Sequence, residues 1–167
     1  DRRQLSVRFQ EPDVLFGSGE SRISREFRAI LRDFFPRYVR ILRRPEYRDA
    51  IAEIRIEGHT SSEWSASVTG LDAYIQNMEL SQDRTRSVLS FVMRMQQSRT
   101  HQDWLTDHLT ANGLSSSEPI MDDGRENRSR SRRVEFRVRT NAEERIRSLV
   151  GSGEQASMTG SFDSEAP

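Results

Sequence analysis

Three stretches of the chain alternate apolar and polar residues, which is the pattern of a β-strand with one buried face. They lie at residues 5–9, 54–58 and 133–139, and their outward positions carry mainly Arg and Glu. A fourth, weaker strand is predicted at 109–113, before a loop rich in Ser that contains Gly and runs to Arg130. The sequence therefore predicts a sheet with one face in the core and one face in water.

Two further stretches repeat apolar residues at helical spacing. The first, at residues 23–41, predicts a helix that Pro36 kinks or splits. The second begins at Ser81, a good N-cap residue, and its apolar face extends to Met95. A short amphipathic helix is also expected at 142–150.

The expected order of elements is strand, helix, strand, helix, strand, strand. It indicates an α+β two-layer sandwich in which helices cover one face of a mixed sheet, and we expect this domain in residues 1–150. Residues 151–167 contain three acidic residues, no basic residue and little apolar surface, so we expect a disordered tail. An RNA-recognition module has a similar order, but its open sheet face displays aromatic residues, whereas this face displays Arg and Glu.

Composition removes several classes of function. The chain has no Cys, and its three His do not have the spacing of a metal site, so we expect no metal and no thiol chemistry. All 26 basic residues are Arg, which excludes lysine chemistry and favours bidentate recognition of carboxylates or phosphates. Acidic residues also number 26, so the formal charges cancel. No apolar run approaches the roughly 20 residues that cross a bilayer.

Arg84 falls near the third residue of the second predicted helix, where a cation opposes the helix dipole. With Ser81 as the cap, the free N–H groups of this turn and the guanidinium group would form a receptor for a carboxylate or phosphate. The alternative is a structural salt bridge from Arg84 to Asp83, Asp72 or Glu63. Spacing alone does not decide between the ligand site and the salt bridge.

The loop that follows the strand at 54–58 lies beside this helix start if the two elements are neighbours in the layer. Thr60 and Ser61 then either contact a polar ligand or close a turn by bonding the local backbone. His59 has no acidic or nucleophilic partner at a usable spacing, and Ser81 serves better as a cap than as a nucleophile. We find no catalytic triad, which favours a binding module over a hydrolase.

Seven Arg and two Glu lie within residues 125–139. A nucleic-acid patch is one interpretation of this excess of positive charge. The other is a solvated loop followed by the outer face of a strand that pairs with Glu57, and the regular alternation favours it. The aromatic residue in this stretch, Phe136, is on the inward face, so we expect no nucleic-acid binding.

Three motifs identify a family. The first is Val-Leu-Phe-Gly-Ser-Gly-Glu at residues 14–20. The second joins Gly-His-Thr at 58–60 to Asn-Met-Glu-Leu-Ser-Gln-Asp-Arg at 77–84, and the third is Ser-Arg-Arg-Val-Glu at 131–135. Together they resemble the OmpA-like peptidoglycan-binding domain, as found in stator subunits of the MotB type, including ZorB-like subunits of the Zorya phage-defence system. The resemblance covers about residues 6–140.

The resemblance implies a pocket for the peptide stem of peptidoglycan, in which Arg84 takes a carboxylate of diaminopimelate. The Asp with which the family binds the ammonium group is replaced by Ser61, which leaves Glu63 or Asp72 to supply the negative charge. The closing Asn of the family is replaced by Ser131. The candidate ligand-binding residues are Ser18, Thr60, Ser61, Glu63, Asn77, Ser81, Arg84 and Arg132.

The resemblance also implies a function. It indicates a non-enzymatic module without a cofactor that binds peptidoglycan and anchors an ion-driven motor to the cell wall, in flagella or in phage defence. The module would be the periplasmic domain of an inner-membrane protein, following a transmembrane segment, with a MotA-like partner subunit and a homodimeric state. The alternative is a wall anchor of an outer-membrane protein or lipoprotein that has no motor role.

Overall fold

The computed structural model describes residues 5–10, 12–64, 68 and 70–141. The helix expected at 142–150 and the tail at 151–167 lie outside the described residues. The elements in chain order are β1 (Ser6–Phe9), α1 (Pro12–Leu15), α2 (Arg25–Leu42), α3 (Pro45–Arg48), β2 (Ile51–His59), α4 (Gly70–Met93), the 3₁₀ helix η1 (Gln96–His101), α5 (Gln102–His108), β3 (Leu109–Gly113), β4 (Met121–Asp122), β5 (Arg125–Glu126), α6 (Arg128–Ser131) and β6 (Arg133–Thr140).

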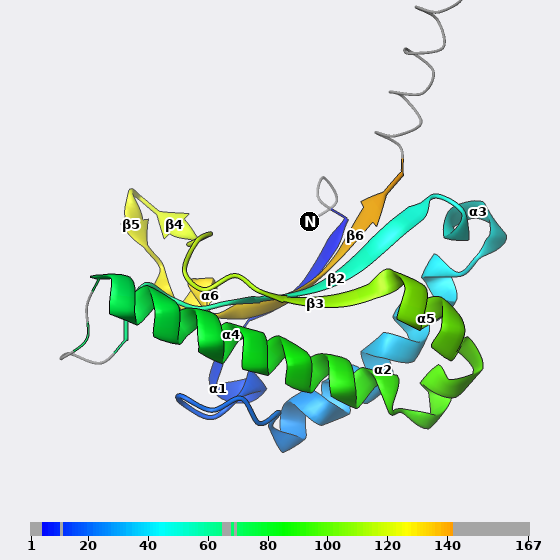
Figure 1. Ribbon diagram of the computed structural model, residues 1–167, viewed down its shortest axis with the longest axis horizontal. Helices are drawn as coiled ribbons and strands as arrows, with labels where there is room; N and C mark the ends of the chain where they lie inside the picture. The colour runs from blue at the N-terminus through cyan, green and yellow to red at the C-terminus, as the bar shows by residue number, and fades with distance from the viewer. Residues whose placement is uncertain (1–4, 11, 65–67, 69, 142–167) are drawn as a thin grey trace, which may run out of the picture.

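The main sheet has the strand order β1-β6-β2-β3 (Figure 1). The last strand, β6, lies between β1 and β2 and is antiparallel to both, whereas β2 and β3 are parallel and are connected through α4, η1 and α5. Helices α2 and α4 lie on the same side of this sheet (Figure 1). The predicted two-layer α+β sandwich with a mixed sheet is confirmed.

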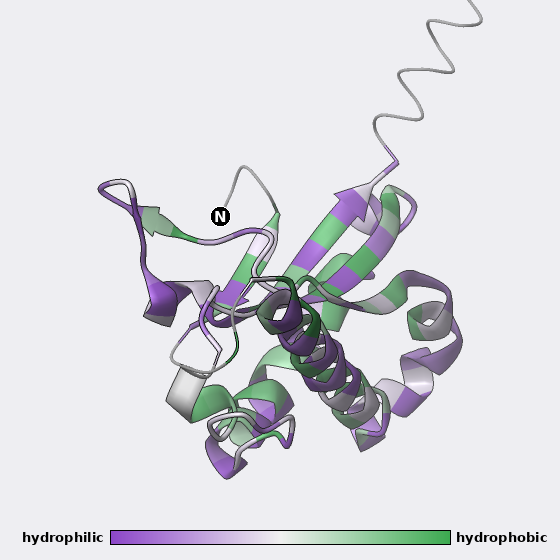
Figure 2. Cartoon of the chain, turned by 60° about the vertical axis from the view of Figure 1, so that its left-hand side comes forward, coloured by the Kyte–Doolittle hydropathy of each residue, from purple (hydrophilic) through white to green (hydrophobic). Residues whose placement is uncertain are grey.

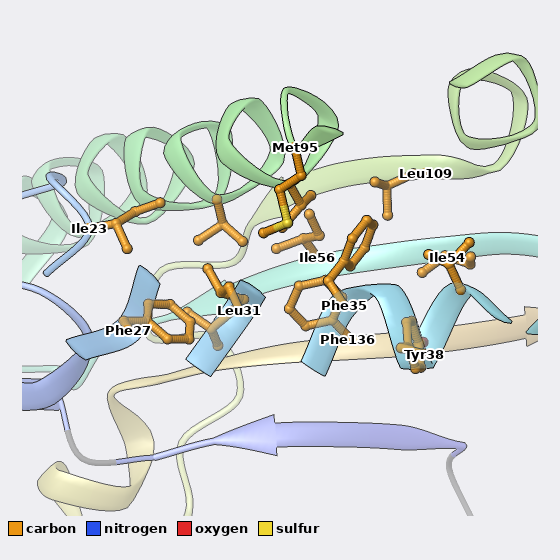
Figure 3. Close-up of a cluster of buried hydrophobic side chains, with 14 of the residues drawn as sticks. Ile23, Phe27, Leu31, Phe35, Tyr38, Ile54, Ile56, Met95, Leu109 and Phe136 are labelled. Atoms are coloured by element: carbon orange, nitrogen blue, oxygen red, sulfur yellow. The ribbon is translucent and has the colours of Figure 1, made fainter. Parts of the chain in front are cut away.

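The core lies between the sheet and the two long helices (Figure 3). Helix α2 contributes Phe27, Leu31 and Phe35, which are at most 1% exposed. Phe136 of β6 is fully buried, and the centroid of its ring lies 6.0 Å from that of Phe35 and 5.9 Å from that of Phe9. Figure 2 shows apolar and polar bands alternating along the strands. Such alternation puts the apolar residues of a strand, including Phe9 and Phe136, on one face of the sheet.

The second long helix begins eleven residues before the predicted start, at Gly70 rather than Ser81. The prediction was wrong because the first turns of α4 break the amphipathic pattern: Leu71 is 72% exposed and Ile75 is 54% exposed. Helix α2 also differs, since it runs unbroken through Pro36. The first and second strands lie where they were expected, but β2 extends to nine residues.

The outer face of the sheet is partly buried, in contrast to the prediction of a wet face. Glu57, Arg133 and Glu135 are 3%, 5% and 0% exposed. The carboxylate of Glu135 accepts from Arg8 at 2.9 Å and from Arg133 at 2.6 Å, and Arg137 lies 3.0 Å from Glu57. The segment with β4, β5 and α6 covers this end of the face, since Arg133 donates to two of its carbonyl groups. The predicted cross-strand pairing with Glu57 is confirmed.

The candidate ligand pocket

A cavity of about 580 Å³ lies between the end of β2 and the middle of α4. Four segments line it: the loop after α1, the loop after β2, the middle of α4, and the residue that follows α6. Seven of the eight predicted residues line this cavity, and Ser81 does not. The lining residues are Phe16, Gly17, Ser18, Gly19, Thr60, Ser61, Glu63, Trp64, Asn77, Leu80, Arg84 and Arg132.

Two glycines let α4 approach the ends of β2 and β3. A Cβ atom on Gly58 would lie 2.6 Å from Cγ2 of Thr85, and one on Gly113 would lie 2.4 Å from the backbone nitrogen of Gln82. No ordinary side chain fits in either place. This close approach brings Arg84 beside the loop that follows β2.

Ser81 has a structural position in the middle of α4. Its hydroxyl donates to the carbonyl of Met78 at 2.9 Å and accepts from the backbone N–H of Ser115 at 3.1 Å. Ser81 is 1% exposed. It therefore fastens the loop after β3 to α4, and the predicted N-cap with a free first turn beside it was wrong.

Arg84 is 9% exposed and holds the loop after α1 in place. Its Nε donates to the carbonyl of Glu20 at 2.8 Å, and Nη2 donates to the carbonyl of Gly17 at 3.3 Å. The guanidinium carbon lies 4.9 Å from the ring centroid of Phe16. These partners are neutral, so they orient the guanidinium group without balancing its charge.

No carboxylate balances Arg84 in the described part of the chain. Of the predicted alternative partners, Asp83 pairs with Arg86 at 2.9 Å and Glu63 with Arg128 at 3.3 Å, and Asp72 forms no ion pair with Arg84 in the described residues. Burial, and then the charge of Arg132, lower the pKa of Arg84 to about 10. Burial is the larger cause of this shift, and the like charge of Arg132 adds to it.

Two further polar groups at the cavity lack partners. The Nε of Arg132 and the hydroxyl of Thr60 are buried and make no hydrogen bond within the described residues. Thr60 is fixed through its backbone, where its N–H donates to the carbonyl of Ser115 at 2.9 Å. Its side chain does not close a local turn, so the hydroxyl is available to a ligand.

The loop after β2 is braced from both sides. The side-chain nitrogen of Asn77 donates to the carbonyl of Glu63 at 3.3 Å, and the N–H of Ser62 donates to Glu126 of β5 at 3.0 Å. Ser61 stands where the resemblance implies an Asp, and it is 3% exposed. Within the described residues, Glu63 is the acidic residue that lines the cavity.

The cavity shows the chemistry of a receptor for an anion with a polar or zwitterionic end. Arg84 and Arg132 provide positive charge, and Thr60 and Ser18 provide hydroxyl groups. Within the described residues, no cluster of three or more His, Cys, Asp or Glu could hold a metal ion. In the same residues, none of the helices is long and apolar enough for a membrane span.

Sequence reasoning missed Phe16, Gly17, Gly19, Leu80 and Trp64, which also line the cavity. The signal for three of them was the motif Phe-Gly-Ser-Gly, since two glycines beside a buried aromatic residue favour a turn that approaches another element closely. Gly19 has a φ angle of +68°, which requires glycine or strain.

Comparisons with known proteins agree with this geometry. The sequence model of the OmpA family matches residues 15–133 of this chain. The Zorya protein ZorB from Escherichia coli is 48% identical over 151 residues, which are 90% of this chain. The chain spans only 63% of the length of that relative.

Two solved structures are similar as well. The cell wall anchor of the T6SS from Pseudomonas aeruginosa is 26% identical with a TM-score of 0.52, and the match covers 81% of this chain and 80% of that one. The periplasmic domain of Helicobacter pylori MotB has a TM-score of 0.59 at 16% identity, and the match covers 89% of this chain and 82% of that one. The family match extends over most of the described fold and over all four segments of the cavity, and the chain belongs to the OmpA family.

Proposed function

We propose that this domain binds the peptide stem of peptidoglycan, without catalysis, and thereby anchors a membrane protein to the cell wall. The observation that carries the proposal is the unbalanced positive charge of the cavity. Arg84 and Arg132 both line the cavity, and the described residues supply neither with a carboxylate. A carboxylate of the ligand between the two guanidinium groups would relieve their repulsion.

The remaining groups of the cavity fit the other atoms of such a ligand. The unpartnered hydroxyl of Thr60 and the hydroxyl of Ser18 can accept or donate hydrogen bonds to peptide groups. Glu63 supplies negative charge for an ammonium group, and its partner Arg128 is 59% exposed and can turn into water. The site therefore suits a zwitterionic side chain such as diaminopimelate.

Arg132→Ala tests this proposal. The Arg132 side chain makes no hydrogen bond in the described residues, so we expect an unchanged or slightly raised melting temperature. Affinity for a stem peptide that ends in diaminopimelate should fall about 10- to 100-fold, the effect of one lost charge-assisted hydrogen bond. Co-sedimentation with purified peptidoglycan and calorimetry with the stem peptide measure this loss.

The control is Arg44→Ala, which removes an exposed arginine that lies outside the cavity. It changes the net charge by the same amount and should leave binding unchanged. Equal affinity of wild type and Arg132→Ala for the stem peptide would contradict the proposal, and so would a wild type that binds neither probe.

We infer that the anchored protein is a stator-type subunit of a phage-defence motor, because the identity to ZorB extends over 90% of this chain. This role implies a periplasmic location, a homodimer and a MotA-like partner in the membrane. The likeness to the T6SS cell wall anchor supports a second candidate, a wall anchor without a motor.

Phage challenge of cells that express the whole protein with its membrane partner separates the two candidates. A defence motor predicts that wild type lowers the plaque count and that Arg132→Ala restores it. A wall anchor without a motor predicts the same plaque count with wild type and with no protein.

A further inference from the structure

A second and larger hollow, of about 830 Å³, lies between α2 and α4. Its floor is apolar, with Ile23 and Met95 buried and Phe91 half-buried. Its rim is basic. We call it the α2–α4 groove, and its lining residues are Arg22, Ile23, Arg28, Arg32, Arg86, Ser87, Ser90, Phe91, Arg94, Met95, Gln96 and Gln97.

The arginines of the groove are largely unbalanced. In the described part of the chain only Arg86 has a carboxylate partner, Asp83 at 2.9 Å. Arg28 and Arg32 lie four residues apart on α2, Arg86 lies on α4, and Arg94 directly follows the last residue of α4. Like charges four residues apart on a helix repel each other, so the pair Arg28 and Arg32 favours a bound anion.

The groove is continuous with the cavity that holds Arg84 and Arg132. A third hollow, of about 530 Å³, lies between them around the loop after α1. It shares Gly17 with the cavity, and it shares Arg22, Ile23, Arg28 and Arg32 with the groove. A chain molecule bound in the cavity can therefore extend past Gly17 into the groove.

The side chains of the groove favour carboxylates over nucleic acid. The guanidinium group of Arg32 lies 5.5 Å from the centroid of the Phe91 ring and covers its face, so this ring is not free to stack on a base. The polar residues of the lining offer guanidinium groups, two Ser hydroxyls and two Gln amides, which suit carboxylates on a peptide. Peptidoglycan carries several carboxylates on each peptide stem.

We propose that the α2–α4 groove is a second binding site for the wall polymer, which takes carboxylates of the peptidoglycan adjoining the stem held in the cavity. This inference rests on the proposed function. It predicts that the polymer binds more tightly than an isolated stem peptide, because the stem alone fills only the cavity. The additional affinity should depend on salt, since the groove arginines are exposed.

The test is the double variant Arg28→Gln and Arg94→Gln, which neutralises one exposed arginine on each wall of the groove. The matched control is Arg44→Gln with Arg99→Gln, which removes the same charge from exposed positions outside the groove. Each protein is measured with two probes: purified peptidoglycan by co-sedimentation, and a soluble stem peptide ending in diaminopimelate by calorimetry. Both measurements are made at about 150 mM salt and repeated at about 1 M.

We expect the groove variant to lose about 3- to 10-fold in affinity for the polymer, as for two exposed ion pairs, with no change for the stem peptide. The loss should disappear at about 1 M salt, where the screening length is about 3 Å. The control should match wild type with both probes.

Three results would overturn the inference. Unchanged polymer binding by the groove variant would show that the arginines are only solvated, and an equal loss with both probes would show that the substitutions disturb the cavity. Displacement of the polymer by short duplex DNA from wild type, but not from the groove variant, would assign the groove to nucleic acid. A wild type that binds neither probe would instead refute the proposed function.

Discussion

Burial of His59 makes the stability of this domain depend on pH. His59 is the last residue of β2 and is 3% exposed. Neither of its ring nitrogens makes a hydrogen bond in the described residues. Burial, and then the positive charge of Arg133, lower the pKa of His59 from 6.5 to about 3. The charge of Glu135 favours the charged form but does not prevail, and the carboxylate oxygen of Glu57 is 3.9 Å from Nε2.

The sign and size of the effect follow from this depressed pKa. Between pH 6.5 and about 3, the unfolded chain binds a proton at His59 that the folded chain does not, so stability is complete above pH 6.5 and falls as the pH is lowered. From pH 7 to pH 5 the expected loss is about 2 kcal/mol, since one pKa unit corresponds to about 1.4 kcal/mol.

Two other groups face His59. Burial raises the pKa of Glu57, so protonation of that group stabilises the fold as the pH falls and opposes the effect of His59. Burial opposes charge on Glu135 as well, but hydrogen bonds and charge from Arg133 and Arg8 prevail and lower its pKa, so stability is lost only as pH falls through that value. The effect of His59 is therefore measured against a variant that lacks the histidine and keeps both carboxyl groups.

Urea unfolding at pH 7, 6 and 5 measures the effect, with His59→Asn as the variant without a titrating group. Relative to the variant, the free energy of unfolding of wild type should fall by about 2 kcal/mol across this interval. The reasoning is refuted if wild type and His59→Asn show the same slope of stability against pH.

Three further substitutions have definite outcomes. Gly113→Ala should lower the free energy of unfolding by about 3 kcal/mol, because the new methyl group meets the backbone of Gln82. In Gly124→Ala the methyl group meets no atom within 4 Å, so the free energy of unfolding should fall by only about 1 kcal/mol, for the φ of +77°. Ser61→Asp should tighten calorimetric binding of the diaminopimelate stem about 10-fold by adding an acid to the cavity. Unchanged affinity would show that Glu63 already binds the ammonium group.

The strands could be predicted from the sequence because their information is local. Apolar residues alternate within each of them, and Ile54 and Phe136, each fully buried, lie on the predicted inward face. The buried charges on the opposite face could not be predicted in this way. Glu135 accepts from Arg8, more than a hundred residues earlier in the chain, and from Arg133, which also donates to the carbonyl of Glu118, and alternation carries no information about such contacts.

The start of α4 shows a second limit of local patterns. Ser81 has the residue type and the apolar neighbours of an N-cap, but it accepts from the N–H of Ser115, a residue far along the chain, and not from its own first turn. Amphipathic spacing detects the part of a helix that lies against the core. The first turns of α4 extend beyond the core, so their apolar residues are exposed and do not follow the amphipathic spacing that predicts a helix.

Arg84 lines the pocket as predicted, but its position does not depend on the start of a helix. The expected first turn of a helix is absent there, and two carbonyl groups of the loop after α1, more than sixty residues away, fix the guanidinium group instead. Neutral carbonyls orient a cation but leave its charge, and Arg132 adds a second charge from the other end of the chain. Neither contact has a local sequence pattern, so family motifs could indicate the residue, but only the fold shows that the charge of Arg84 has no carboxylate partner in the described residues. The same hydrogen bonds hold Gly17 and Glu20. A ligand that bound Arg84 would therefore also change the contacts of the loop after α1, which lies between the cavity and the α2–α4 groove.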